Sequence, residues 1–264
     1  MDLTLDLPPR HLDLEGVSNF RDMGGYRGHG GRAVRWGRLF RSGNLHRLTP
    51  GDRQRLAPLG LALVVDFRQR AEQEREPSAW DPASAPRTCA AEVVPGSAES
   101  FFRATGDSTV SLDRTAEFMA HLYRDMVVNQ TAAWRAMFEG ILATREGAVL
   151  MHCAAGKDRT GFAGALVLSA LGVAWEDVTR DYLLTARYQD PDEEMARVLR
   201  VAEHLVKPPM SREVIRPMFE VRPAYLAAAR EELEARWGSV DAYLTRELGL
   251  GPAERRTLEA RYLA

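Results

Sequence analysis

The sequence predicts an α/β fold in which a central, mostly parallel β-sheet is flanked by helices and followed by a helical C-terminal region. Two short, continuous apolar runs, Leu61–Phe67 and Ala148–Cys153, are typical of strands buried on both faces. Helical patterns separate these runs, which favours parallel strands joined by helical crossovers. From Pro191 onward the pattern is helical, interrupted at prolines and glycines.

The other elements are predicted from local patterns. A short strand pattern lies within residues 33–42, after a glycine-rich turn. Residues 77–111 are rich in Pro, Ser, Ala and Gly, which predicts mostly loop, with a short strand near residues 91–94. Apolar positions three and four apart over residues 112–144 predict two helices, and residues 160–171 are expected to form a further, apolar helix.

The composition excludes several classes of protein. With 45% hydrophobic and 27% charged residues, the 264-residue chain is neither disordered nor fibrous, and its net charge of −2 argues against nucleic-acid binding. Two cysteines cannot form a disulfide framework. The acidic N-terminus is no signal peptide, and the apolar stretch Gly161–Trp175 is too short to span a membrane. We therefore expect a cytoplasmic protein, with export independent of a signal peptide left open. The 33 arginines and two lysines indicate a GC-rich, bacterial genome.

The segment from His152 to Gly161, His-Cys-Ala-Ala-Gly-Lys-Asp-Arg-Thr-Gly, joins a predicted buried strand to a predicted apolar helix. A loop of this kind points successive backbone N–H groups at one place, where an oxyanion can bind. The small residues Ala154, Ala155 and Gly156 let the backbone approach a phosphate, and glycine adopts backbone angles that other residues rarely reach. The segment therefore predicts a phosphate-binding loop.

The side chains of this loop indicate nucleophilic chemistry. Cys153 lies near a helix N-terminus and several cations, so we expect a thiolate at neutral pH. Arg159 offers a planar fork that can bind two phosphate oxygens, most strongly as charge spreads in the transition state. The hydroxyl of Thr160 can donate to the sulfur and help it leave, and His152 is expected to order the loop through hydrogen bonds.

The loop resembles the signature of the cysteine-dependent protein tyrosine phosphatases. Five further segments extend the resemblance to the bacterial tyrosine phosphatase family of the mycobacterial phosphatase B and Listeria lipid phosphatase type. These segments are Asn19–Gly25, Leu39–Leu45, Asp66–Glu72, Asp181–Leu184 and Tyr225–Leu244. The resemblance implies a phosphotyrosine-phosphatase-like fold, expected here as a single phosphatase domain over residues 1–264. It also implies activity on phosphotyrosine, in some members on phosphoserine or phosphothreonine, and on phosphoinositides.

Together these features predict a two-step phosphatase in which Cys153 attacks phosphorus and water then hydrolyses the cysteinyl phosphate. The expected partner is a phosphorylated protein or a phosphoinositide, with no cofactor, no nucleic acid and no stable membrane insertion. The remaining histidines show no metal-ligand spacing, so no metal is expected. Two alternatives stay open. A rhodanese-type sulfurtransferase would not need Arg159 followed by a threonine, and a catalytically idle phosphate-binding module would usually lack the cysteine or the arginine.

Three aspartates are candidates for the acid that protonates the leaving group. Asp158 lies in the loop, and the Asp-Arg-Thr ending resembles the myotubularin and Sac phosphoinositide phosphatases. Lys157 and Arg159 favour the ionised form of Asp158, an effect that a bound phosphate dianion would oppose. Asp66 follows a predicted strand, at the edge where α/β sheets place their sites. Asp81, which precedes a proline, is better explained by a turn.

Four further features have two interpretations each. Lys157 could meet a second phosphate of the substrate or only stabilise the thiolate. Arg21, beside a Gly-Gly turn, is expected to be structural, with support of the phosphate-binding loop as the alternative. Cys89 is expected to be an idle thiol, and a protective disulfide with Cys153 is the alternative. Residues 190–221 are expected to be either a helical lid over the site, as the resemblance suggests, or a plain helical pair.

Overall fold

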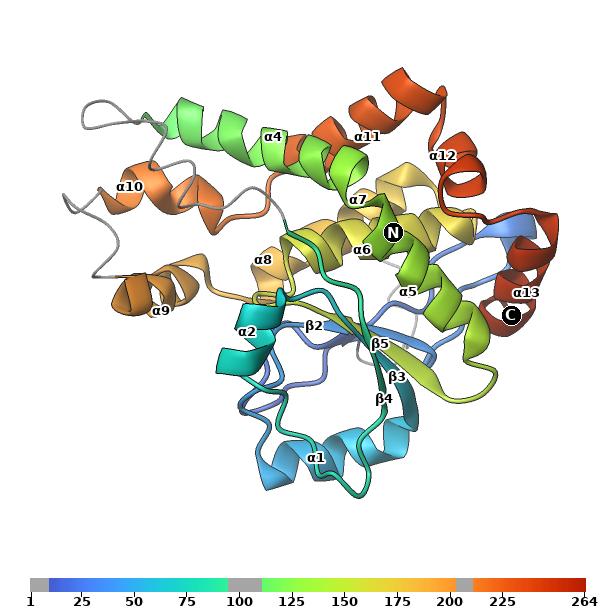
Figure 1. Cartoon of the computed structure of the whole chain (residues 1–264), viewed down its shortest axis with the longest axis horizontal. Coiled ribbons are helices and arrows are strands. Elements are labelled where there is room, and N and C mark those ends of the chain that lie inside the picture. Colours follow the sequence, from blue (N-terminus) through green and yellow to red (C-terminus); the bar gives the residue numbers. More distant parts are fainter. Residues whose placement is uncertain (1–9, 95–110, 203–210) are drawn as a thin grey trace, which may run out of the picture.

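The computed structural model describes residues 10–94, 111–202 and 211–264. Its five strands form one sheet in the order β1-β2-β5-β3-β4 (Figure 1). The strands are β1 (Arg21–Asp22), β2 (Leu39–Ser42), β3 (Leu61–Asp66), β4 (Arg87–Ala90) and β5 (Ala148–His152). The β2–β5, β5–β3 and β3–β4 pairs are parallel, whereas β1 runs antiparallel to β2. The expected mostly parallel sheet of an α/β fold is confirmed.

Helices cover the sheet and make up the C-terminal region. As far as the helix that follows β5 they are α1 (Pro50–Leu56), α2 (Arg70–Arg75), α4 (Leu112–Asn129), α5 (Thr131–Ala143) and α6 (Asp158–Ala170). Beyond it lie α7 (Trp175–Leu183), α8 (Thr185–Tyr188), α9 (Pro191–Ala202), α10 (Arg212–Ile215), α11 (Pro223–Trp237), α12 (Val240–Arg246) and α13 (Pro252–Tyr262). Three 3₁₀ turns complete the described elements: η1 (His29–Gly31), η2 (Ala57–Leu59) and η3 (Arg216–Met218). The two helices expected over residues 112–144 and the apolar helix after β5 are confirmed.

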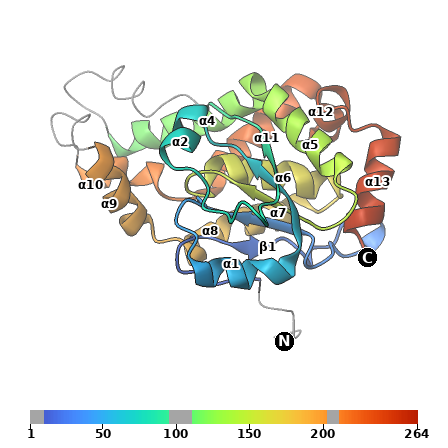
Figure 2. The same cartoon turned by 60° about the horizontal axis from the view of Figure 1, so that its bottom comes forward.

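The central strands bury side chains on both faces, as their continuous apolar sequences predict. Leu63, Val65 and Met151 join the larger core, on the face covered by α4, α5 and α6. Val64 and Leu150, which alternate with them, join a smaller core on the face covered by α1 (Figures 1 and 2). Because both faces are covered, the position of the sheet is fixed from both sides.

The short strand expected near residues 91–94 is wrong in position, since β4 ends at Ala90. β4 is an edge strand with mostly exposed side chains, so it carries no apolar pattern. The apolar residues that suggested the strand, Ala91 and Val93, are buried just beyond it. Their N–H groups donate to the carbonyls of Asp66 and Phe67 at 3.0 and 3.2 Å.

The C-terminal helices lie in two places. In Figures 1 and 2, α9 and α10 stand at the end of the molecule opposite α13. Helix α11 packs along α4 and so belongs to the larger core. The helical C-terminal region is confirmed in its described residues. Residues 203–210 of the segment considered as a lid lie outside them.

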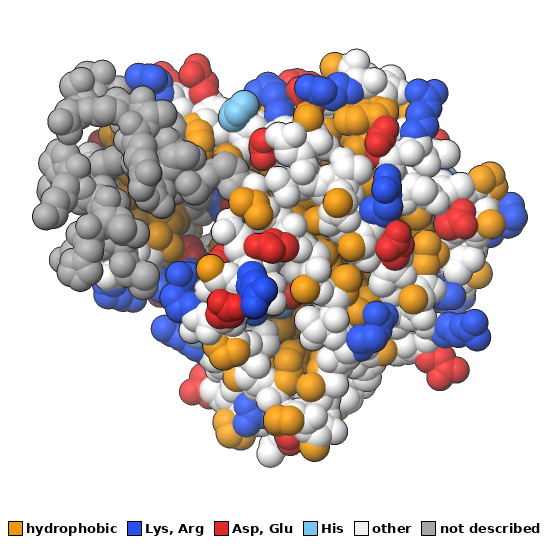
Figure 3. All heavy atoms as spheres, viewed as in Figure 1, with side chains coloured by type: hydrophobic (Ala, Val, Ile, Leu, Met, Phe, Trp, Pro, Cys, Tyr) orange, Lys and Arg blue, Asp and Glu red, His pale blue; other side chains and the backbone are white. Residues whose placement is uncertain are grey.

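The surface carries charges of both signs. On the face shown in Figure 3, basic and acidic side chains of the described residues are interspersed. No helix of the described ranges is long and apolar enough to cross a membrane.

The carboxyl ends of three strands meet at one edge of the sheet. Ser42 at the end of β2 and Asp66 at the end of β3 both pair with His152 at the end of β5. The loops that follow these strands therefore start side by side, at the edge where α/β sheets place their sites.

Candidate active site

The loop between β5 and α6 turns sharply at Gly156. This residue has a φ of +66°, in the left-handed region that glycine adopts freely. A Cβ atom here would lie 2.4 Å from the carbonyl oxygen of Ser42, at the end of β2. The N–H group of Asn44, just after β2, donates to the carbonyl of Ala154 at 2.9 Å. The small residues of the loop thus allow it to pack directly against the backbone that follows β2.

The backbone of this loop leaves donors available at the N-terminus of α6. Within the described part of the chain, the N–H groups of residues 154–160 donate no hydrogen bond. The N–H group of Gly161 donates to the Lys157 carbonyl at 2.8 Å and is therefore already used inside the helix. Cys153 is only 2% exposed, and the buried hydroxyl of Thr160 has no hydrogen-bond partner among the described residues. Such an arrangement suits an oxyanion next to a thiol.

Arg159 is held by a carboxylate from α2. Its Nη1 and Nη2 donate to Oε2 and Oε1 of Glu72 at 2.6 and 2.9 Å. Burial would lower the pKa of Arg159, but the hydrogen bonds to Glu72 and the charge of Glu72 outweigh this effect and raise that pKa above its usual value. Burial would raise the pKa of Glu72, and the contact with Arg159 holds it below its usual range. Sequence reasoning did not identify Glu72 as a site residue, although it closes a segment that carries the resemblance.

The carbonyl of Gly156 is the point at which buried side chains hold the loop. Nδ2 of Asn19 and Nη2 of Arg41 donate to it at 2.9 and 3.1 Å. Asn19 has a φ of +59°, a left-handed conformation that asparagine tolerates better than most residues. Arg21 donates to the side-chain oxygen of Asn19 and so supports the loop indirectly.

Asp181 of α7 neutralises both of these arginines. Its Oδ2 accepts from Nη1 of Arg41 at 2.7 Å, and its Oδ1 lies 3.7 Å from Nε of Arg21. Oδ1 also accepts from the hydroxyl of Tyr26 at 3.2 Å. Burial would raise the pKa of Asp181, but the two arginines hold it below its usual range. Neither Arg41 nor Asp181 was a candidate from the sequence, and their places in matching segments were the available signal.

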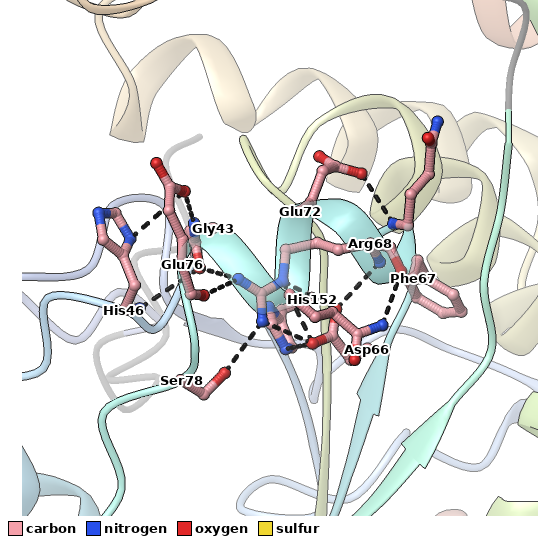
Figure 4. A network of polar contacts seen from close by, with 12 residues as sticks. Gly43, His46, Asp66, Phe67, Arg68, Glu72, Glu76, Ser78 and His152 are labelled. Atoms are coloured by element: carbon pink, nitrogen blue, oxygen red, sulfur yellow. Dashed lines mark hydrogen bonds and ion pairs between the residues drawn. The ribbon is translucent and has the colours of Figure 1, made fainter.

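At the end of β3, the carboxylate of Asp66 lies against the side chains of Arg68 and His152 (Figure 4). Nη2 and Nε of Arg68 donate to its two carboxylate oxygens at 2.7 and 3.0 Å, and Nε2 of His152 lies 3.4 Å from Oδ2. Burial would raise the pKa of Asp66, but the contacts with His152 and Arg68 lower it below its usual range. Asp66 is therefore ionised, which does not suit a proton donor. Neither ring nitrogen of His152 makes a hydrogen bond among the described residues, so the hydrogen bonds expected from His152 are not found, and its contact with Asp66 is the ion-pair distance alone.

Asp158 begins α6 and keeps its carboxylate partly accessible. Its side chain is 28% exposed. Oδ1 accepts from the hydroxyl of Tyr123 at 2.8 Å, and Oδ2 lies 3.4 Å from Nζ of Lys157. Of the three aspartates considered as the acid, Asp158 alone lies at the junction of the loop and α6, and its carboxylate is partly exposed there.

Lys157 is bound by the C-terminal region. Its ammonium donates to the carbonyls of Met218 and Glu220, the latter at 3.2 Å, and its side chain is 4% exposed. Met218 ends η3, within the segment considered as a lid. In this conformation a second phosphate would have to displace these carbonyls to reach Lys157.

Two candidates lie away from the loop. Asp81 is exposed, and its Oδ1 accepts from the N–H group of Ala83 at 3.0 Å, as in an ordinary turn. Cys89 lies on β4, where burial raises the pKa of its thiol. Because β3 separates β4 from β5, these strands are about 10 Å apart, beyond the reach of a disulfide between Cys89 and Cys153.

A cavity of about 530 Å³ opens beside the loop at Ala154. Residues 14–18 line one part of it, and residues 188–200, including α9, line another. Arg197 in this lining is held by Glu194 of the same helix at 2.9 Å. In the described residues, no group of three or more His, Cys, Asp and Glu side chains is arranged to hold a metal ion.

Comparisons with known proteins agree on one family. A family model described as the tyrosine phosphatase family matches residues 12–264. A protein of Cupriavidus necator, provisionally named a tyrosine-protein phosphatase, is 39% identical over 261 residues, which cover 97% of this chain and 89% of that protein. The triple specificity protein phosphatase PtpB of Mycobacterium tuberculosis is 31% identical over 274 residues, covering 91% of this chain and 95% of that protein. A tyrosine-protein phosphatase of Nostoc commune is 27% identical over 226 residues, covering 84% and 72%.

Replacing Asp181 with Asn should lower the free energy of unfolding at neutral pH by about 3–5 kcal/mol, because two buried arginines lose their carboxylate. Folding lowers the pKa of Asp181, so its stabilisation is present above the unfolded value of about 4 and is lost as the pH falls towards the folded value. Urea denaturation at several pH values should therefore show the difference between wild type and variant shrinking in acid.

Asp177→Asn is the matched control, since Asp177 lies on the same helix and pairs with the exposed Arg180. Loss of this pair should cost less than about 1 kcal/mol. If the free energies of unfolding of wild type and Asp181→Asn differ by the same amount at every pH, the charge of the Asp181 carboxylate is not what stabilises the protein.

Proposed function

The chain belongs to the tyrosine phosphatase family and is a phosphatase, and we propose that it hydrolyses phosphotyrosine and other phosphate monoesters through a cysteinyl-phosphate intermediate on Cys153. One observation carries this proposal. A buried cysteine adjoins the N–H groups of residues 154–160, which donate no hydrogen bond to any described residue and are thus available to phosphate oxygens. We propose that the whole chain forms one phosphatase domain around this loop.

In the first step the Cys153 sulfur attacks phosphorus, so that a sulfur–phosphorus bond forms while the bond to the leaving oxygen breaks. The N–H groups of residues 154–160 and the guanidinium of Arg159 stabilise the charge on the phosphoryl oxygens. Glu72 holds that guanidinium in one orientation through two hydrogen bonds. The groups that stabilise the negative charge on the phosphoryl oxygens are thus in place before the substrate binds.

Asp158 supplies the proton that the leaving oxygen needs. It lies in the loop and is partly exposed, whereas Asp66 is held ionised by Arg68 and Asp81 caps an exposed turn. In the second step the Asp158 carboxylate accepts a proton from the water that attacks phosphorus, and the sulfur–phosphorus bond breaks. The Thr160 hydroxyl, which is buried without another partner among the described residues, donates to the departing sulfur.

We extend the proposal to more than one class of phosphate monoester. The Mycobacterium tuberculosis relative carries triple specificity in its name. Lys157 offers a cation for a second phosphate, as in a phosphoinositide, once its ammonium leaves the carbonyls of Met218 and Glu220. Phosphoserine and phosphothreonine proteins are included on the ground of that relative's name.

We propose residues 190–221 as a lid over this site. Helix α9 lines the cavity beside the loop, and the carbonyls that bind Lys157 belong to the same segment. One movement of this segment would both widen the cavity and free Lys157 from the carbonyls of Met218 and Glu220. Because the reaction needs a reduced Cys153, we propose that the protein works in the cytoplasm.

Release of inorganic phosphate from a phosphotyrosyl peptide, a phosphoseryl peptide and a panel of phosphoinositides tests the proposed substrates. We expect release from all three classes by the wild type, and none above background by Cys153→Ser, because a serine hydroxyl is a much weaker nucleophile than a thiolate. Cys89→Ser is the matched control, since it changes the other cysteine, on β4, and should keep the wild-type rate. Turnover by Cys153→Ser would contradict the covalent mechanism, and release from phosphotyrosine alone would confine Lys157 to stabilising the thiolate.

Replacing Glu72 with Gln should lower kcat/KM for p-nitrophenyl phosphate by about 10²-fold, because the guanidinium of Arg159 loses its fixed orientation. Initial rates of p-nitrophenol release measure the change. Glu74→Gln controls for the loss of a carboxylate on α2, since Glu74 is exposed and pairs with Arg70 at 2.8 Å. Equal rates for both variants would remove Glu72 from the mechanism.

A further inference from the structure

Three buried tyrosines from different helices meet next to the phosphate-binding loop. They are Tyr123 of α4, Tyr182 of α7 and Tyr225 of α11, each at most 1% exposed. The ring of Tyr123 lies edge-on to that of Tyr182, with centroids 6.1 Å apart, and 5.9 Å from that of Tyr225. Two of them, Tyr182 and Tyr225, lie in segments that carry the family resemblance, and the steps described above use none of the three.

A hydrogen-bond chain leads from these tyrosines to Asp158. The hydroxyl of Tyr123 donates to Oδ1 of Asp158 at 2.8 Å, and it lies 2.8 Å from the hydroxyl of Tyr182. Because Tyr123 gives its own proton to the carboxylate, Tyr182 must be the donor between the two hydroxyls. Burial, followed by the charge of Asp158, raises the pKa of both phenols well above its usual value, so both remain neutral donors at physiological pH.

The two oxygens of Asp158 therefore differ. Oδ1 is occupied by the Tyr123 hydroxyl. Oδ2 faces Nζ of Lys157 at 3.4 Å, and Lys157 directs its hydrogen bonds to the carbonyls of Met218 and Glu220. When Asp158 carries a proton, we therefore expect that proton on Oδ2, because Oδ1 already accepts the hydrogen bond from Tyr123.

We infer that Tyr123 is a positioning residue for the acid of the reaction: its hydroxyl fixes Oδ1 of Asp158, so that Oδ2 delivers the proton to the leaving oxygen. This inference rests on the proposed role of Asp158. As the bond from phosphorus to the leaving oxygen breaks, the proton moves from Oδ2 to that oxygen and Asp158 becomes a carboxylate. The hydrogen bond from Tyr123 strengthens as this charge forms, because charged acceptors bind donors more strongly than neutral ones. Tyr123 then favours the transition state over bound substrate, and its loss affects kcat rather than KM.

A purely structural tyrosine would behave differently. The Tyr123 hydroxyl satisfies a buried donor, and its loss could lower activity by loosening the helices around the loop. Such an effect would be the same for every substrate. Loss of a positioned acid instead affects substrates whose leaving group needs a proton, so alkyl phosphates should suffer and aryl esters with good leaving groups should not.

The test compares Tyr123→Phe, Asp158→Asn and the double variant on an alkyl phosphate and on p-nitrophenyl phosphate. We expect Tyr123→Phe to lower kcat for the alkyl phosphate by about 10- to 100-fold with little change in KM. For p-nitrophenyl phosphate we expect little change in kcat/KM, which reports the first step alone and not the later hydrolysis in which Asp158 acts as the base. In the Asp158→Asn background the same change should have no further effect, because Tyr123 acts through Asp158. Tyr182→Phe should give a smaller loss with the same selectivity, and it keeps the test valid if Tyr123→Phe folds poorly.

Tyr243→Phe is the matched control. Its buried hydroxyl donates to the carbonyl of Val127 at 3.3 Å, on the same helix as Tyr123, and makes no contact with Asp158 in the described structure. This variant should leave kcat for both substrates unchanged. A selective loss in Tyr243→Phe would show that any disturbance of α4 produces the effect.

The outcomes separate the inference from the function on which it rests. If both single variants lose activity on the alkyl phosphate alone, and the double variant loses no more than Asp158→Asn, the result would support the role of Tyr123 and the role of Asp158. A selective loss in Asp158→Asn with an unselective or additive loss in Tyr123→Phe would overturn the role of Tyr123 and leave Asp158 as the acid. An unselective loss in Asp158→Asn would overturn the role of Asp158 itself, and with it that of Tyr123.

Discussion

The conformation of the loop between β5 and α6 depends on the buried carboxylate of Asp181. Arg21 and Arg41 enter the interior beside the loop, and burying either charge alone would be strongly unfavourable. Asp181 compensates both charges. Arg41 donates directly to the Gly156 carbonyl, and Arg21 donates to Asn19, whose amide donates to the same carbonyl. Two buried donors thus fix this carbonyl, and with it the turn of the loop, from the inside.

The groups proposed for the chemistry are each held by a different part of the fold. Glu72, after β3, orients Arg159, and Asp66 at the end of β3 lies against His152. The hydroxyl of Tyr123, on α4, donates to Asp158. Because the supports are separate, losing one of them should disable one chemical function before it unfolds the site. The carboxyl ends of the parallel strands make this possible, since they bring these loops to one edge of the sheet.

The features that the sequence predicted are those with a local signal. β3 and β5 are continuous apolar runs, and the loop after β5 combines small residues with Cys153 and Arg159, so both could be recognised without tertiary information. β4 could not be placed, because an exposed edge strand has no apolar pattern. Glu72 and Tyr123 reach the loop through tertiary packing, from 87 and 35 residues away in the chain. An ordinary glutamate or tyrosine on a helix carries nothing in its local pattern that reveals such a partner.

In the proposed mechanism the phosphoryl group passes through a covalent bond to Cys153. Rapid acid quenching during turnover of an aryl phosphate, followed by mass spectrometry of the digested enzyme, tests for this bond, because a good leaving group makes the first step fast and lets the intermediate accumulate. We expect one phosphoryl group on the peptide that contains Cys153, formed in step with the burst of released phenol. A phosphoryl group on another side chain, or a burst without any phosphorylated peptide, would contradict it.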